Sequence, residues 1–354
     1  MREGIRTRRW AGTLPGERIL AKELQVSVGT VHAALKQLET EALLSAHGAG
    51  RARVVVHKAR RKTTAGASLR VGILPYESPA TDVMLMQSLL FAVSRSLEEA
   101  GHKPFMPAKT MSALRHRPGS ILKMMLAEEA EAWLLVTPRL EVTEALLQKL
   151  ERPLFTIGGQ PSKEPVAGVT LGVDSAMAAM LAALVDAGHR RICALLPPRY
   201  HRPTPSRMLT AVREGLAALG LRPGSFNTPE WDGSREGLRA ILETLFKITP
   251  PTALIVDDVR HAVAIQSYFA ERGIRPGRIA LIVIGQDPVL AWMSPAPGVI
   301  HGDVDGFSRQ VIRWVQSCAD GRPGRERVVI QGRFESGFIP VITPGDSSSI
   351  KGID

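Results

Sequence analysis

The chain has 354 residues, of which 44% are hydrophobic, so it is long enough to form two or three ordinary domain cores. It has no run of about eighteen apolar residues, and no apolar segment follows the basic N-terminus, which argues against a membrane span or a secretory signal and predicts a cytoplasmic protein. Cys193 and Cys318 are far apart, and no two histidines have the His-x-x-x-His spacing of metal ligands, so we expect buried free thiols and no metal site.

Positive charge is concentrated near the N-terminus. Residues 1–68 carry 13 Lys and Arg against 5 Asp and Glu, a net charge of +8 out of +11 for the whole chain. Contacts with nucleic-acid phosphates require such an accumulation of positive charge. A basic face that is merely solvated is the alternative explanation.

The first predicted elements are two helices followed by a hairpin. Pro15 favours a helix start, and residues 17–24 then place Ile19, Leu20 and Leu24 on one apolar side. Ser27 can cap a second helix after a break at residues 25–26. The apolar positions of this helix recur at three and four residues, at Val31, Ala34, Leu35 and Leu38. Glycines and a β-branched run over residues 47–56 predict a two-stranded wing.

These elements predict a winged helix-turn-helix. In such motifs the first residues of the second helix contact base edges, while backbone amides and cationic side chains contact phosphates. The candidate DNA-binding residues are Arg18, Ser27, Thr30, His32, Arg51 and Arg53.

The segments Leu14–Arg18 and Val26–Leu35, followed by the glycine-containing wing, resemble the GntR family of winged-helix regulators. The resemblance covers residues 14–56 and implies a DNA-binding domain over residues 1–57. The sequence departs from the family pattern at Gly16, where serine is usual, at Val28, where a basic residue is usual, and at His32, where arginine is usual. The family's base contacts therefore do not transfer to these positions.

The pattern changes after this segment. Residues 58–68 are polar, basic and aperiodic, which predicts a linker. From Leu69 onward, short β-rich runs alternate with amphipathic helices, which predicts parallel βαβ units arranged in two Rossmann-like lobes. The expected strands include residues 70–74, 133–137, 154–157, 168–172, 191–196, 253–256, 279–284, 327–330 and 334–338. The expected helices include residues 82–100, 141–150, 174–187, 206–219, 259–272 and 303–319.

Three motifs in this part of the chain are similar in order and spacing to the effector domain of LacI/GalR regulators. They are a helix that opens at Asp174 and ends before Gly188, a helix over residues 207–221, and the strand ends 255–258 and 282–287. The resemblance implies an α/β fold: an N-terminal winged helix-turn-helix plus a two-lobed Rossmann-like domain of the periplasmic-binding-protein type I kind over residues 69–345, with a tail at 346–354. It also implies that the chain returns to the first lobe before it finishes on the second. A GntR-type head on a LacI/GalR-type body resembles the arabinose-responsive regulators.

Ligands of open parallel sheets bind outside the carboxyl ends of the strands, and in a two-lobed protein this edge faces the interlobe cleft. Carboxylates and an arginine can pair with vicinal hydroxyls, and a tyrosine ring can cover a sugar face, so the expected effector is a sugar. The candidate effector-binding residues are Tyr76, Ser78, Arg139, Arg207, Asp257 and Asp287.

The choice of two of these residues rests partly on the resemblance to LacI/GalR regulators. Asp287 corresponds to the family's ligand-contacting aspartate, and Arg207 lies one residue from the position of the family's ligand arginine. A solvent-facing place at a helix start is the alternative for Arg207, and helix capping is the alternative for Asp257.

The sequence as a whole predicts a sequence-specific DNA-binding transcriptional regulator, with repression favoured over activation. The expected partners are a double-stranded DNA operator, a small-molecule effector and a second copy in a homodimer, with no cofactor and no membrane. One alternative is a regulator without a small-molecule effector that is controlled by protein contacts. Another is an aminotransferase-like enzyme body, but Lys123, Lys149 and Lys247 lie on expected helices without the acidic partner that such chemistry needs, so we expect no enzymatic activity.

Overall fold

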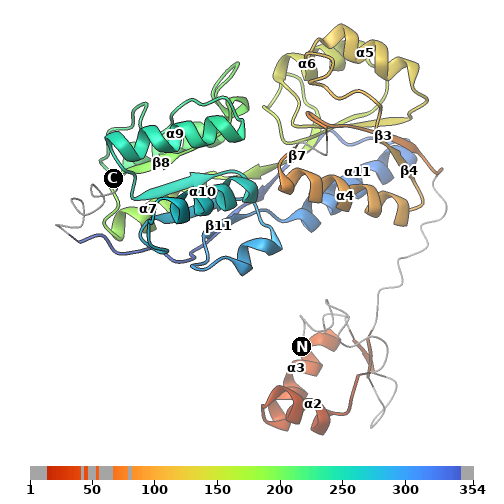
Figure 1. Cartoon of the computed structure of the whole chain (residues 1–354). Helices are drawn as coiled ribbons and strands as arrows, with labels where there is room; N and C mark the ends of the chain where they lie inside the picture. The colour runs from red at the N-terminus through yellow and green to blue at the C-terminus, as the bar shows by residue number, and fades with distance from the viewer. Residues whose placement is uncertain (1–13, 41–43, 47–52, 56–66, 79–81, 344–354) are drawn as a thin grey trace. The chain divides into compact units, whose positions relative to one another are not determined.

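A computed structural model of the chain describes residues 14–40, 44–46, 53–55, 67–78 and 82–343 (Figure 1). The chain forms two compact units, Met1–Gly66 and Ala67–Asp354. The described part of the first unit contains the helices α2 (Glu17–Leu24) and α3 (Val28–Thr40) and an antiparallel pair of strands, β1 (Leu44–Ala46) and β2 (Arg53–Val55).

The two helices of the first unit pack through a small apolar core. Leu20 of α2 and Val31 and Leu35 of α3 are fully buried. Ile19 was expected on the same apolar side, but its side chain is 62% exposed, and Ala21 is buried instead. The expected apolar side of α2 was therefore wrong at this position, because the helix turns the 20–21 edge toward α3.

The second unit begins with a lobe built on a six-stranded parallel sheet in the order β12-β7-β6-β5-β3-β4. Its strands are β3 (Arg70–Leu74), β4 (Lys103–Phe105), β5 (Ala132–Val136), β6 (Leu154–Ile157), β7 (Ala167–Gly172) and β12 (Arg327–Gln331). The helices α4 (Met84–Glu99) and α11 (Val304–Ala319) pack on one face of the sheet. The helices α5 (Pro118–Ala127) and α6 (Leu140–Lys149) pack on the other face. The central strand β5 is buried along its whole length, as expected for a sheet covered on both faces.

The second lobe has a five-stranded sheet in the order β13-β11-β10-β9-β8. Its strands are β8 (Ile192–Ala194), β9 (Ala253–Val256), β10 (Ala280–Ile284), β11 (Gly298–His301) and β13 (Arg333–Glu335), of which only β13 is antiparallel to its neighbour. The helices α7 (Asp174–Asp186) and α8 (Arg207–Ala218) pack on one face, and α9 (Arg235–Ile248) and α10 (Val259–Glu271) on the other. The 3-10 turns η1 (Pro198–Tyr200) and η2 (Pro288–Trp292) follow β8 and β10.

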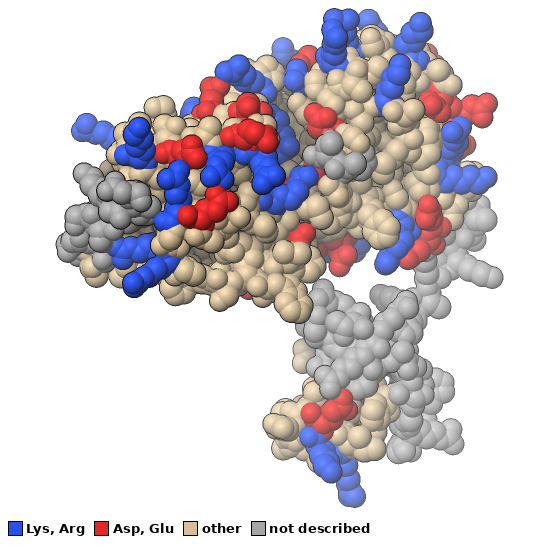
Figure 2. All heavy atoms as spheres, in the orientation of Figure 1, with Lys and Arg blue, Asp and Glu red and all other residues tan. Residues whose placement is uncertain are grey.

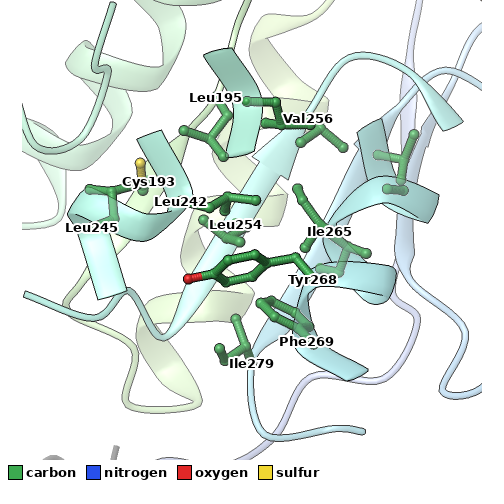
Figure 3. Packing of buried hydrophobic residues seen from close by; sticks show 14 of the residues in the cluster. Cys193, Leu195, Leu242, Leu245, Leu254, Val256, Ile265, Tyr268, Phe269 and Ile279 are labelled. Atoms are coloured by element: carbon green, nitrogen blue, oxygen red, sulfur yellow. The ribbon is translucent and has the colours of Figure 1, made fainter. Parts of the chain in front are cut away.

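The core beneath α9 and α10 packs these helices against the sheet. Figure 3 shows the Tyr268 ring packed among Leu242, Leu254 and Phe269. Cys193 of β8 is buried in the same cluster, and burial raises the pKa of its thiol. This cysteine is therefore a core residue, as the sequence predicted.

The chain crosses between the lobes three times, after β7, after β11 and after β12. At these crossings the amide of Gly332 donates a hydrogen bond to the Gly172 carbonyl oxygen at 2.8 Å. A Cβ on Gly332 would lie 3.3 Å from the carbonyl oxygens of both Gly172 and His301, so a side chain here would push the crossings apart. The return of α11 and β12 to the first lobe and of β13 to the second agrees with the expected topology.

The alternation of strands and helices is confirmed, with differences in particular elements. The helices α5 and α9 and the strands β4 and β11 were not among those expected. The last strand covers residues 333–335 instead of 334–338.

Candidate functional site

A buried carboxylate lies at the carboxyl end of β9. The side chain of Asp257 is 1% exposed, accepts a hydrogen bond from the Arg199 guanidinium and lies 3.0 Å from Nδ1 of His261. Arg199 comes from η1, and its guanidinium carbon lies 5.1 Å from the centre of the Tyr200 ring. Burial raises the pKa of the Tyr200 hydroxyl, so this group stays neutral beside the ion pair.

The neighbouring carboxylate, Asp258, caps α10 and also reaches the first lobe. Its Oδ1 accepts hydrogen bonds from the amide and the Nε of Arg260, at 2.7 and 2.9 Å. Its Oδ2 accepts one from the Met84 amide of the first lobe at 3.0 Å. Arg260 completes the link, because its Nη2 donates to the Asp82 carbonyl oxygen at 2.7 Å. The start of α4 and the start of α10 are thus joined by direct hydrogen bonds.

The two carboxyl groups in this link differ in their ionisation. Burial disfavours the charged form of Asp258, but its hydrogen bonds from Arg260 and the Met84 amide outweigh that effect, and its pKa is lowered. Burial raises the pKa of Asp82, whose Oδ2 is shielded from solvent and has no hydrogen-bond partner among the described residues. Asp258 is therefore ionised where it accepts the hydrogen bond from the first lobe.

A groove with a volume of about 990 Å³ opens at this contact. Its walls come from α9 between Arg235 and Leu242, from α10 along its whole length, from Val83 and Met84 of the first lobe, and from Arg199 and Asp287 in the segments that follow strands of the second lobe. Positive and negative side chains are interspersed on the surface over α9 and α10 (Figure 2). Asp287 is half-buried and caps η2, accepting a hydrogen bond from the Val289 amide at 2.8 Å.

A second group of side chains gathers at the carboxyl edge of the first lobe's sheet. The ring of Tyr76, after β3, lies 4.5 Å from the ring of His116. Glu77 accepts a hydrogen bond from the Ser112 hydroxyl at 2.6 Å. Arg139, after β5, precedes the first turn of α6, and its Nε is shielded from solvent without an acceptor. The two groups are electrostatically linked, because Glu77 influences the pKa of both His116 and Asp82, and Arg199 also influences that of Asp82.

The predicted effector-binding residues divide between these two groups. Tyr76 and Arg139 lie at the first lobe's edge, and Asp257 and Asp287 lie at the second lobe's edge. Ser78 is exposed, and its backbone carbonyl accepts from the Asp82 amide at 2.9 Å.

Arg207 is brought to neither group. It is the first residue of α8, its side chain is 59% exposed, and it pairs with Asp174 at 2.9 Å and Glu214 at 3.1 Å. The arginines at the lobe contact are Arg199 and Arg260, which sequence reasoning missed. The usable sign for Arg199 was its place in the segment after a strand, five residues beyond the last residue of β8, whereas Asp257 follows β9 directly.

Three of the predicted DNA-binding residues, Arg18, Thr30 and His32, lie on the helices of the first unit, and a fourth, Ser27, lies between them. Ser27 precedes α3 as expected, and its Oγ accepts from the Thr30 amide at 3.1 Å and lies 2.8 Å from the Thr30 hydroxyl. His32 Nδ1 lies 3.0 Å from a carboxylate oxygen of Glu17 on α2, and Arg18 is exposed. Arg51 lies outside the described residues, and of Arg53 only the backbone, in β2, is described.

Neither a metal site nor a membrane span is found in the described part of the chain. No three His, Cys, Asp or Glu side chains there are grouped to hold a metal ion. None of the described helices is long and apolar enough to cross a membrane.

The chain was compared with known proteins. Residues 181–334 match the model of the periplasmic-binding-protein-like domain family. No curated protein sequence matches the chain.

Several solved structures share the fold. The lac repressor dimer bound to operator and the anti-inducer ONPF is 14% identical, with a TM-score of 0.65 over 78% of this chain and 95% of that one. A LacI-family regulator from Enterococcus faecium with bound ribose is 14% identical, with a TM-score of 0.62 over 78% of this chain and 100% of that one. The complex of the transcriptional regulator CelR with cellobiose is 15% identical, with a TM-score of 0.64 over 92% of this chain and 100% of that one. The second unit thus has the two-lobed fold of the periplasmic-binding-protein-like domains, with parallel sheets and helices on both faces.

Proposed function

We propose that the chain is a DNA-binding transcriptional regulator, with repression as its favoured mode, whose affinity for an operator is controlled by a sugar bound between the two lobes of the second unit. The observation that carries this proposal is the pair of polar groups at the carboxyl edges of the two sheets, next to a contact between the lobes in which Asp258 accepts a hydrogen bond from the Met84 amide and Arg260 donates one to the Asp82 carbonyl oxygen. A ligand bound between two such edges contacts both lobes and can change their relative orientation. The bound sugars of the two regulators compared above support a sugar as the effector.

The first unit supplies the DNA-binding part of the proposal, a winged helix-turn-helix of the GntR type over residues 1–57. Two features support it: helix α3 begins with the exposed polar pair Ser27 and Thr30, and the antiparallel strands β1 and β2 follow this helix. In helix-turn-helix proteins the first turn of the second helix contacts base edges. Arg18 and His32 on the helices, and Arg51 and Arg53 of the wing, would add contacts with phosphates or bases. Such a protein would act in the cytoplasm, where the operator lies.

In the second unit, Asp287 would accept hydrogen bonds from sugar hydroxyls, while Arg139 and Arg199 would donate them. Asp257 is buried against Arg199 and His261 and would hold Arg199 in place. Tyr76 offers an aromatic face to the ring carbons. Arg207 and Ser78 contribute less to this proposal, because the first is paired with acidic side chains in solvent and the second is exposed.

The proposal is tested by fluorescence anisotropy of the purified chain on DNA from upstream of its own gene, titrated first with salt and then with a panel of sugars. Binding that weakens with rising salt and that changes when one sugar is added supports it. Tight DNA binding that no sugar alters would support the alternative of control by protein contacts, and absence of DNA binding would refute the proposal.

A further inference from the structure

Arg139 stands out at the carboxyl edge of the first lobe's sheet because nothing neutralises it. The residue is half-buried, and within the described part of the chain its side chain has no hydrogen bond and no ion pair. Its Nε is fully shielded from solvent without an acceptor. A buried donor without an acceptor costs free energy, and the cost is larger for a charged group. A side chain in this state is expected where a ligand supplies the missing acceptor.

The acidic side chains near Arg139 form no ion pair with it in the described part of the chain. Glu77 accepts a hydrogen bond from the Ser112 hydroxyl at 2.6 Å, and Glu141 is exposed in the first turn of α6. His116 adds no second positive charge, because burial, followed by repulsion from Arg139, lowers its pKa and keeps the ring neutral. Arg139 is thus the cation of this group.

Residues with a strained backbone lie close to Arg139. Thr137, Arg115 and His116 have φ angles of 51°, 52° and 51°, a region that side chains other than glycine rarely adopt. Strained residues of this kind gather at ligand sites, where the surrounding structure holds them in place. In addition, Arg139 is the N-cap residue of α6, and no side chain caps the start of this helix.

At the edge of the second lobe's sheet, the arginines of the lobe contact are paired with carboxylates. Arg199 is paired with Asp257, and Arg260 with Asp258. A neutral sugar in the cleft would therefore leave the charge of Arg139 uncompensated. An anionic group would neutralise this charge and accept charge-assisted hydrogen bonds from the guanidinium. We infer that the effector is a sugar derivative with an anionic group, a carboxylate or a phosphate, and that Arg139 binds this group. The inference rests on the proposed sugar effector and specifies its chemical class.

The test compares acids with their neutral counterparts by isothermal titration calorimetry on the full chain. The pairs are D-gluconate and D-glucitol, D-galacturonate and D-galactose, L-arabinonate and L-arabinose, and D-glucose 6-phosphate and D-glucose. We expect at least one acid to bind ten times or more tightly than its counterpart. The sugar acids and the sugar phosphate separate the two sources of negative charge.

Variants then assign the effect to Arg139. Arg139→Gln should weaken binding of the acid by about 10- to 100-fold and remove the preference for it, and Arg139→Lys should retain part of it. Arg95→Gln, which removes an exposed arginine of α4 that is paired with Glu99 at 3.2 Å, should change nothing. The unfolding midpoint of each variant shows whether it is folded, and the comparison of acid with neutral sugar in the wild-type chain needs no variant.

Two results would overturn the inference and leave the proposed function intact: a neutral sugar that binds as tightly as its acid, or an acid whose affinity is unchanged by Arg139→Gln. If DNA binding is intact and no member of any pair binds, the proposed sugar effector fails together with the inference.

Discussion

At the scale of single residues, two ion pairs between an aspartate and an arginine differ in how far their side chains are buried. Asp257 and Arg199 form a pair in which the carboxylate is 1% and the arginine 28% exposed, whereas in the pair of Asp174 and Arg207 both side chains are 59% exposed. Loss of one partner of a buried pair leaves the other charge desolvated, while an exposed charge is solvated again by water. The first pair is therefore the one on which the structure of the second unit depends.

Asp257→Asn should lower the free energy of unfolding by about 1–3 kcal/mol, a value discounted for the partial exposure of Arg199. Asp174→Asn, the matched control, should leave unfolding unchanged. Urea unfolding of both variants beside the wild type checks this. Equal midpoints for all three proteins would show that the Asp257 pair contributes nothing to stability.

The sequence could identify Asp257 because its position after a buried strand follows from local pattern. It could not identify Arg199 as the partner, because the contact joins residues 58 positions apart and depends on how η1 folds back. Arg207 was selected because it lies one residue from the position of the ligand arginine in LacI/GalR regulators. In the structure, acidic side chains on α7 and α8 hold this arginine in solvent.

At the scale of elements, the start of α10 does two tasks. Asp258 accepts a hydrogen bond from the Arg260 amide in the first turn of α10 and another from the Met84 amide of α4. Arg260 orients the Asp258 carboxylate and donates a hydrogen bond to the Asp82 carbonyl oxygen. A helix cap of this kind contributes about 1 kcal/mol. Here the same group also sets how the two lobes meet.

Arg260→Gln should loosen the lobe contact, because the hydrogen bond to the Asp82 carbonyl and the alignment of Asp258 are both weakened. The amide of Met84 should then exchange with deuterium faster than in the wild type, as local opening becomes less costly. Arg239→Gln, which removes an exposed arginine of α9 paired with Glu271, is the control and should not alter this exchange. Unchanged protection of Met84 in Arg260→Gln would contradict a role for Arg260 in the contact.

Most helices and central strands were predictable, because their apolar periodicity is strong and their lengths are ordinary. The strands β4 and β11 have only three and four residues, so they show no periodicity to detect. In their sheets, β4 is an edge strand and β11 lies next to an edge. Their pairing is decided by the neighbouring strand and by the packed helices, which are tertiary effects.

At the scale of the whole molecule, the second unit exposes large apolar side chains that the lobe cores do not use. Phe91 of α4 is 70% exposed and Trp292 of η2 is 88% exposed, and Val263 of α10 and Val289 are about half exposed. The helices α4 and α10 lie in line on the side shown in Figure 1. Exposed apolar groups of this size often mark a protein interface, which supports the proposed homodimer.

Phe91→Lys and Trp292→Ser should each shift the chain from dimer toward monomer in sedimentation velocity runs at micromolar concentration. DNA binding should weaken as well, because the two heads of a dimer bind two half-sites with avidity. Ile248→Ser is the control, since this residue is 71% exposed at the end of α9 and lies outside that group. A wild-type chain that is monomeric at these concentrations would contradict the homodimer.

The central claim, that effector binding and DNA binding are coupled, is tested most directly by measuring both affinities on the same preparation. Anisotropy gives the operator affinity with and without the sugar or sugar acid that binds, and calorimetry gives the ligand affinity with and without operator. The account predicts that the two ratios are equal within error and differ from one by about 5- to 150-fold, as a coupling free energy of about 1–3 kcal/mol requires. Identical operator affinity with and without a bound ligand would contradict it.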